Sequence, residues 1–265
     1  MKPLYFGSSD APLFGCLHSP SFGRANRGAV LLCYPMGREY VLIHRTYLQL
    51  TTRLAKSGFY VLRFDYHGCG DSAGDEADVA ISECLNNIAI AIDELKKRSG
   101  WNKVCLVGQA VGATLATLAA SERNDVDSLV LWDIVINGRD YVKERLDLHK
   151  AWLDVNLFRP KQKELEPNEG EVLGFLLPPA LRGELEDIDL LALPQLLVEK
   201  VFFVLSREDT SITEFHQHLL MLHRICDMKN IPWPAWIQSG EVFEVLAPPV
   251  KILQPIIEWI GKEHP

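Results

Sequence analysis

The residues Gly108-Gln109-Ala110-Val111-Gly112 have the spacing of a motif that presents a nucleophile, except at its centre. A serine at position 110 would complete Gly-x-Ser-x-Gly, in which a sharp turn from a strand into a helix exposes an activated hydroxyl. The methyl group of Ala110 cannot attack a carbonyl carbon, and Cys105 lies too early, within the predicted strand. We interpret Ala110 as a nucleophile position that has lost its nucleophile, whether natural or engineered, and both glycines as packing residues.

A base is also missing where one is expected. The histidine that activates such a nucleophile would follow the last strand, and the corresponding segment WIQSGEVFEVLAPPV offers Glu241 instead. Glu241 could accept a proton, but without a nucleophile it has nothing to activate. His264 stands next to the end of the chain, where fraying is expected. The other histidines of this region fall on a predicted helix, away from the expected position: His216, His218 and His223.

Two carboxylates could occupy the acid position of the site, and the sequence leaves both open. Asp209 follows the predicted strand VFFVLS, and Asp133 ends the predicted strand SLVLW. Asp209 also stands just before a helix that is predicted to begin near Ser211. Because aspartate is a favoured helix N-cap, we place the capping role of Asp209 ahead of a catalytic one.

An oxyanion hole needs only backbone donors, so it can persist without catalytic side chains. The expected donors are the N–H of Val111 and one N–H from the loop after the third strand, at Met36 or Gly37. Their presence would indicate a retained backbone geometry rather than activity.

The loop DYHGCGDSAGD resembles a dinucleotide-binding fingerprint only superficially, through Gly68-x-Gly70-x-x-Ala73. Such a fingerprint opens directly into a helix, and Gly74-Asp75 interrupts it here. We therefore expect no cofactor, and the sequence also suggests no metal site. His67 and Ser72 are predicted to shape this loop, and together with Gln109 they are our candidates for ligand contacts.

The elements that must position these residues alternate between strands and helices, which predicts an α/β fold with a mostly parallel sheet. Continuous apolar runs such as GAVLLCY are typical of strands buried on both faces. Strands are predicted at 4–6, 13–18, 28–34, 59–66, 103–108, 128–132, 200–206 and 234–238. Helices are predicted at 44–56, 77–100, 110–123, 212–226 and 250–262.

The alternation breaks after Trp132. Residues 137–197 are rich in Leu, Glu, Arg and Pro, with helical patches and no clear strand. We interpret them as a helical cap inserted into a single domain that spans residues 1–265.

Composition limits the function classes. A net charge of −8 argues against sequence-independent nucleic-acid binding, which needs a positive field. The chain shows no signal peptide and no apolar run of membrane-spanning length. Its cysteines form no C-x-x-C pair, so we expect reduced thiols and a cytoplasmic protein. They are Cys16, Cys33, Cys69, Cys84, Cys105 and Cys226.

Longer segments of the sequence resemble those of a known protein family. The segment YPMGREYVLIHRTYLQLTTRLAKSGFYVLRFDYHGCGDSAGD resembles serine-aminopeptidase-like members of the α/β-hydrolase superfamily. LVLWDIVINGRDYVKERLDLHKAWL and EVLGFLLPPALRGELEDIDLLAL are similar to the insertion of hydrolase-like proteins associated with bacterial exosortase and exopolysaccharide systems. The resemblance implies an α/β-hydrolase fold, an eight-stranded sheet flanked by helices with a helical cap, and an esterase-, thioesterase- or peptidase-like ancestry with acyl or ester-like ligands.

Three function classes follow. The favoured one is a homologue that binds an acyl- or ester-like ligand or a partner in the old cleft, with a degenerate catalytic triad. The second is a working hydrolase, either with Ala110 engineered from serine or with a different site around His44, His67 and Ser72. The third is a scaffold in a biosynthetic or export assembly, with the cap as a docking surface for a protein partner; a homo-oligomer is equally open.

Overall fold

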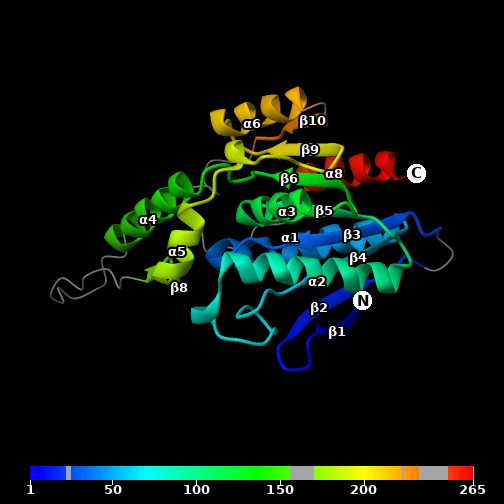
Figure 1. Cartoon of the computed structure of the whole chain (residues 1–265), viewed down its shortest axis with the longest axis horizontal. Coiled ribbons are helices and arrows are strands. Elements are labelled where there is room, and N and C mark those ends of the chain that lie inside the picture. Colours follow the sequence, from blue (N-terminus) through cyan, green and yellow to red (C-terminus); the bar gives the residue numbers. More distant parts are fainter. Residues whose placement is uncertain (22–24, 156–169, 223, 233–249, 265) are drawn as a thin grey trace.

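The computed structural model of the chain describes residues 1–21, 25–155, 170–222, 224–232 and 250–264. Its centre is an eight-stranded sheet in the spatial order β1-β2-β4-β3-β5-β6-β9-β10 (Figure 1). The first two pairings are antiparallel and the others are parallel. The strands are β1 (Lys2–Gly7), β2 (Pro12–His18), β3 (Gly28–Cys33), β4 (Phe59–Phe64), β5 (Val104–Gln109), β6 (Val126–Trp132), β9 (Lys200–Leu205) and β10 (Ile225–Asn230). The predicted mostly parallel eight-stranded sheet is confirmed.

Helices cover both faces of this sheet. The helices are α1 (Gly37–Lys56), α2 (Ile81–Ser99), α3 (Val111–Ser121), α4 (Gly138–Val155), α5 (Pro179–Glu186), α6 (Thr210–Met221) and α8 (Val250–Glu263), with short 3-10 turns η1 (Glu76–Asp78) and η2 (Leu190–Ala192). The chain steps from β3 to β4 through α1 and back across to β5 through α2. Because such crossovers are right-handed, α1 and α2 lie on opposite faces. α8 packs with α1, and α3 packs with α2.

The central strands explain why the sheet needs helices on both sides. All six residues of β3 are buried, and every residue of β5 except Gln109 is buried. Apolar side chains on both faces of a strand must be covered by other elements, which the flanking helices do. The cysteines are all free, and four of them are buried. This agrees with the expectation of reduced thiols.

Two predicted elements differ from the structure. α1 begins at Gly37 rather than at His44, so the loop after β3 enters the helix directly. The segment after α6, predicted as helix up to Cys226, is instead strand β10. β10 is a largely exposed edge strand, so it lacks the apolar alternation that would have revealed it. The strand predicted at 234–238 lies outside the described residues.

Between β6 and β9 in the sequence, the elements α4, α5 and β8 gather at the carboxyl ends of the parallel strands, at the left of Figure 1. This segment contains a small hairpin that was not predicted, β7 (Glu171–Val172) and β8 (Phe175–Leu176). Leu173 and Gly174 turn between these strands with φ of 55° and 87°, as a tight hairpin requires. Strands of two residues are too short to show a sequence period. The limits of the cap at 137–197 and the single-domain interpretation stay predictions.

No helix in the described ranges is long and apolar enough to cross a membrane.

Candidate functional site

The residues of the predicted site converge where β3, β5, β6 and β9 end. Cys33 pairs with Gly108 across β3 and β5, and Gln109 pairs with Trp132 across β5 and β6. Ala110 then leaves the sheet with φ of 49° and ψ of −126°, and α3 begins at Val111. Few residues with a side chain adopt this backbone conformation. The strand–turn–helix expected around Ala110, here called the elbow (residues 108–112), is therefore present.

The two glycines of the elbow are required by backbone packing. A Cβ on Gly108 would lie 2.4 Å from the Cα of Ala113. A Cβ on Gly112 would lie 2.5 Å from the carbonyl oxygens of both Cys33 and Tyr34. Such distances are impossible for real side chains, so the glycines let α3 pack closely against β5 and β3.

The predicted oxyanion donors lie at the starts of two helices. Val111 is the first residue of α3, and Met36 is the N-cap of α1, which begins at Gly37. N–H groups in the first turn of a helix have no partner within that helix. Gly37 has a φ of 58°, which turns the chain from the end of β3 into α1. The backbone thus offers helix N-termini at both predicted donor positions.

The two candidate acids differ in what their carboxylates already do. Asp209 is the N-cap of α6, and its side chain accepts from the N–H groups of Ser211 and Ile212 at 2.9 and 3.4 Å. The predicted capping role is confirmed. Asp133 follows β6 beside the elbow, and its two oxygens accept from the N–H and the hydroxyl of Ser206 at 2.7 and 2.5 Å. Burial raises the pKa of Asp133, while the hydrogen bonds from Ser206 act in the opposite direction.

No described histidine is bonded to either candidate acid. Within the described part of the chain, no histidine forms a hydrogen bond or ion pair with Asp133 or Asp209. His216 and His218 lie on α6, as predicted. His223 and Glu241, the residue at the expected histidine position, lie outside the described residues.

His264 is held in place rather than frayed, which corrects the expectation. Its ring lies 3.1 Å from the hydroxyl of Ser128 and 3.6 Å from the carboxylate of Asp127, and Arg27 donates to its carbonyl. Serine, histidine and aspartate thus meet, but Ser128 is 0 % exposed within β6. A nucleophile must reach a substrate, so this contact fastens α8 to the sheet and does not form a catalytic site.

His67 and Ser72 shape their loop, as predicted. The hydroxyl of Ser72 donates to the carbonyl of Asp65 at 2.6 Å and accepts from the N–H of Phe14 at 2.8 Å. The ring of His67 packs so closely on Gly74 that a Cβ there would lie 2.2 Å from it. Gln109 differs from both, since its side-chain oxygen is buried without a hydrogen-bond partner among the described residues.

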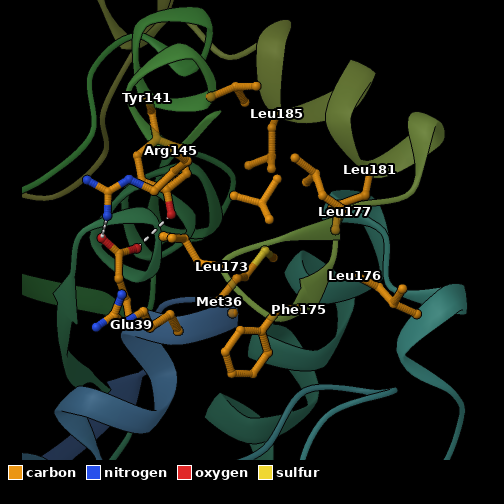
Figure 2. Close-up of a pocket in the computed structure, with 14 residues that line it drawn as sticks. Met36, Glu39, Tyr141, Arg145, Leu173, Phe175, Leu176, Leu177, Leu181 and Leu185 are labelled. Carbon is orange, nitrogen blue, oxygen red and sulfur yellow. Dashed lines mark hydrogen bonds and ion pairs between the residues drawn. The ribbon is translucent and has the colours of Figure 1, made fainter. Parts of the chain in front are cut away.

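A pocket opens between the loop after β3 and the elements α4, α5 and the β7–β8 hairpin (Figure 2). Its volume is about 70 Å³. Most of its lining is apolar and comes from the loop, α4, the hairpin and α5: Met36, Val142, Val172, Leu173, Phe175, Leu176, Leu177, Leu181 and Leu185. This apolar pocket therefore extends from the predicted oxyanion loop to α4, α5 and the hairpin.

A polar cluster closes one side of the apolar pocket and was not predicted. Glu39 accepts from the hydroxyl of Tyr141 at 2.6 Å and from Arg145 at 3.0 Å (Figure 2). Glu144 pairs with both Arg145 and Arg207. Burial raises the pKa of Glu39, while Arg145 and Tyr141 favour its charged form. Tyr141 and Arg145 share a face of α4 at a spacing of four residues, but no sequence signal links them to Glu39.

The described residues contain no group of three or more His, Cys, Asp or Glu side chains that could hold a metal ion.

Comparison with known proteins places this geometry in a family. The family described as "Serine aminopeptidase, S33" matches residues 25–162, more than half of the 265-residue chain. The chain belongs to this serine aminopeptidase S33 family. The elbow, the loop after β3 and the start of the cap all lie within the matched region.

Relatives of this S33-family chain match part of their length. Human Protein ABHD12B is 40% identical over 89 residues, 32% of this chain and 24% of the relative. Lysophosphatidylserine lipase ABHD12 of Xenopus tropicalis is 31% identical over 100 residues, 36% of this chain and 25% of the relative. The chain thus spans about a quarter of the length of the curated relatives it matches.

Solved structures show the fold over the whole S33-family chain. Est1E from Butyrivibrio proteoclasticus with bound ferulic acid superposes with a TM-score of 0.63 at 17% identity, covering 98% of this chain and 97% of the other. At this identity the likeness shows the fold alone. The predicted α/β-hydrolase fold is confirmed.

Proposed function

We propose that the chain binds an acyl- or ester-like ligand in the apolar pocket and does not hydrolyse it through a Ser-His-Asp triad. The observation that carries this proposal is Ala110, whose methyl group stands at the strained turn where the S33 family places a nucleophile. Neither the methyl nor the flanking groups of the elbow can form an acyl-enzyme. In this proposal Asp133 holds the acid position, because the carboxylate of Asp209 caps α6.

The chemistry of the pocket supports the ligand class. Three charged residues line it, Arg38, Glu39 and Arg145, and Glu39 is paired with Arg145 and Tyr141; the rest of the wall offers mainly hydrocarbon. Apolar walls with a few fixed polar groups are typical of small-molecule sites. A volume of about 70 Å³ suits a slender group such as a short acyl chain. The lipase name of the Xenopus relative and the ferulic acid bound to Est1E agree with an ester-like ligand.

In this proposal the backbone supplies the complementary polar contact, from Gly37, which lines the pocket, and from Val111, which is not itself a lining residue. The helix starts at Gly37 and Val111 present N–H groups and the positive ends of helix dipoles toward the loop region. A ligand carbonyl oxygen would accept from such donors as it does in an oxyanion hole. Gln109, with its unpartnered buried side-chain oxygen, is a further candidate contact.

The wider setting follows from the family resemblance. We propose that the protein acts in the cytoplasm of a bacterium, in an exosortase-linked, exopolysaccharide or other biosynthetic system. Binding of a protein partner or of a second copy of the chain is compatible with this proposal. Hydrolysis at an alternative site around His44, His67 and Ser72 has less support. The hydroxyl of Ser72 is already committed to Asp65 and Phe14, and no hydrogen bond within the described ranges joins these three residues.

The test separates binding from chemistry. Wild-type protein should leave p-nitrophenyl butyrate unhydrolysed above the buffer rate. It should bind the stable amide butyranilide, as measured by saturation-transfer NMR. Turnover of the ester by wild type above the buffer rate, retained in a Ser128→Ala control, would contradict the noncatalytic part, since Ser128 is buried and does not line the pocket.

A pair of leucine variants tests the binding part. Leu177→Trp places an indole in the apolar pocket and should weaken butyranilide binding at least about tenfold. Leu191→Trp makes the same change at an exposed leucine outside the pocket and should bind like wild type. Equal binding by both variants would remove the apolar pocket as the ligand site.

A further inference from the structure

A second cavity, of about 450 Å³, shares no lining residue with the apolar pocket. It lies among β2, the ends of β3 and β4, and the first turns of α1. We call it the Arg63 pocket, because Arg63 of β4 lines it together with the aromatic rings of Phe14, Tyr34, Tyr40 and Phe64. Nothing in the proposed function uses it.

Arg63 is a buried cation that forms no ion pair with the residues that the structure describes. It is only 9 % exposed and lies on β4, between β2 and β3 in the sheet. One terminal nitrogen, Nη1, reaches the hydroxyl of Tyr34 at 3.3 Å and the Nε2 of His44 at 3.5 Å. Nη2 contacts the sulfur of Met1 at 3.8 Å, and Nε is buried with no hydrogen-bond partner. Such a group is costly to bury unless an acceptor is supplied.

The nearby carboxylate is held away from Arg63 by its own loop. Asp65 accepts from the hydroxyl of Tyr40 at 2.8 Å and from the N–H of Asp71 at 3.1 Å. Gly70 makes room for it, since a Cβ there would lie 2.3 Å from the carboxylate. Within the described ranges no carboxylate forms an ion pair with Arg63. The loop therefore satisfies Asp65, and the terminal nitrogens of Arg63 contact only Tyr34, His44 and Met1, none of which is an anion.

We propose that the Arg63 pocket binds a small organic carboxylate with a flat apolar body. Two carboxylate oxygens match the planar fork of a guanidinium, and the Tyr34 hydroxyl, which accepts from Arg63, has its own proton left to donate. The apolar body of the ligand packs among the rings that line the pocket. A monoanion is favoured over phosphate, because Asp65 and Asp71 also line the pocket and would repel a second negative charge.

Benzoate is the probe for this proposal, because it combines a carboxylate with a flat ring. Titration calorimetry on the full chain at neutral pH and low salt should show one benzoate site. Arg63→Met should weaken binding at least about tenfold, because the charged fork is lost. Arg45→Met removes an arginine from an exposed position next to His44 on the same helix, and should bind as wild type does.

A second variant keeps the test decisive where Arg63→Met fails to fold. Tyr34→Phe retains the ring and Arg63 but deletes the hydroxyl, and should weaken benzoate binding about threefold. Inorganic phosphate should bind more weakly than benzoate in wild type. The proposal is overturned if wild type does not bind benzoate, if both Arg63→Met and Tyr34→Phe bind it as tightly as wild type, or if phosphate binds more tightly.

Because the two pockets share no lining residue, failure here leaves the acyl-binding proposal standing, and Leu177→Trp should not change benzoate affinity.

Discussion

Ala110 keeps a backbone conformation whose usual purpose is to expose a reactive oxygen. Its φ of 49° and ψ of −126° carry strain on the order of 1–3 kcal/mol. The strain persists without a nucleophile because the neighbouring glycines fix how α3 packs on β3 and β5. Backbone packing therefore maintains the elbow conformation, and its contribution to protein stability can be measured without an assay of catalysis.

Gly112→Ala should lower the free energy of unfolding by about 3 kcal/mol, because the new methyl would overlap two backbone carbonyls after β3. Gly183→Ala is the matched control, since Gly183 lies within α5 with open space around its Cα. There the same change should stabilise by about 0.5–1 kcal/mol. Urea unfolding measures both. Similar values for the two variants would mean that the elbow glycine is not needed for packing.

Asp209→Ala should lower the free energy of unfolding by about 1 kcal/mol, because the N-cap of α6 is lost. Asp209→Ser should restore most of this loss, because serine also caps helices. Thermal unfolding followed by circular dichroism distinguishes the three proteins. A serine variant as unstable as the alanine variant would show that the carboxylate does something beyond capping.

At the scale of elements, ion pairs fasten α2 to the turn before β6. Asp125 accepts from Lys96 at 2.6 Å and from Arg123 at 2.7 Å, and Arg123 also reaches Asp93 on α2. The hydrogen bond from Arg123 is the main cause that lowers the pKa of Asp125 to about 2, from a usual value near 3.8. Since the folded pKa is the lower one, this stabilisation is present above about pH 4 and is lost as the pH falls toward 2.

Asp125→Asn should therefore reduce stability at neutral pH by about 2 kcal/mol and flatten its dependence on pH between about 4 and 2. Asp147→Asn removes a carboxylate from a far more exposed pair with Lys150 and should change little. Urea midpoints measured across the pH series provide the comparison. Parallel curves for wild type and Asp125→Asn would contradict the assigned pKa.

The sequence revealed elements with strong local patterns and missed those without them. Gly108 and Gly112 identified the elbow, since their spacing is local. β10 stayed hidden because its residues are mostly exposed, and Ile225 even faces solvent with 60 % exposure. The pairing of Glu39 with Arg145 joins distant parts of the chain, which no single-sequence pattern reports. Arg63 stands out in the sequence as a charged residue within a mostly apolar strand. Its lack of an ion-pair partner among the described residues, however, depends on Asp65 being bound by its own loop, which the sequence does not reveal.

At the scale of the whole molecule, the chain retains the α/β-hydrolase architecture of the S33 family and two separate pockets near the carboxyl ends of its strands. One pocket is apolar and lies against α4, α5 and the hairpin; the other is aromatic with a buried guanidinium. Helices begin at Gly37 and at Val111, the two positions where we predict oxyanion donors. The side chains that would complete a triad are not assembled by the described residues.

The most direct measurement is the intact mass of the Ala110→Ser variant after incubation with a fluorophosphonate. Restoring the hydroxyl at the elbow should give no stoichiometric adduct, because we propose that the chain supplies no base there and the described residues place no histidine on either candidate acid. Wild type should be equally unmodified, and an active serine hydrolase in the same tube should be fully labelled. Complete labelling of the Ala110→Ser variant at position 110 would contradict the proposed loss of the triad, since it would demonstrate a working base beside the elbow.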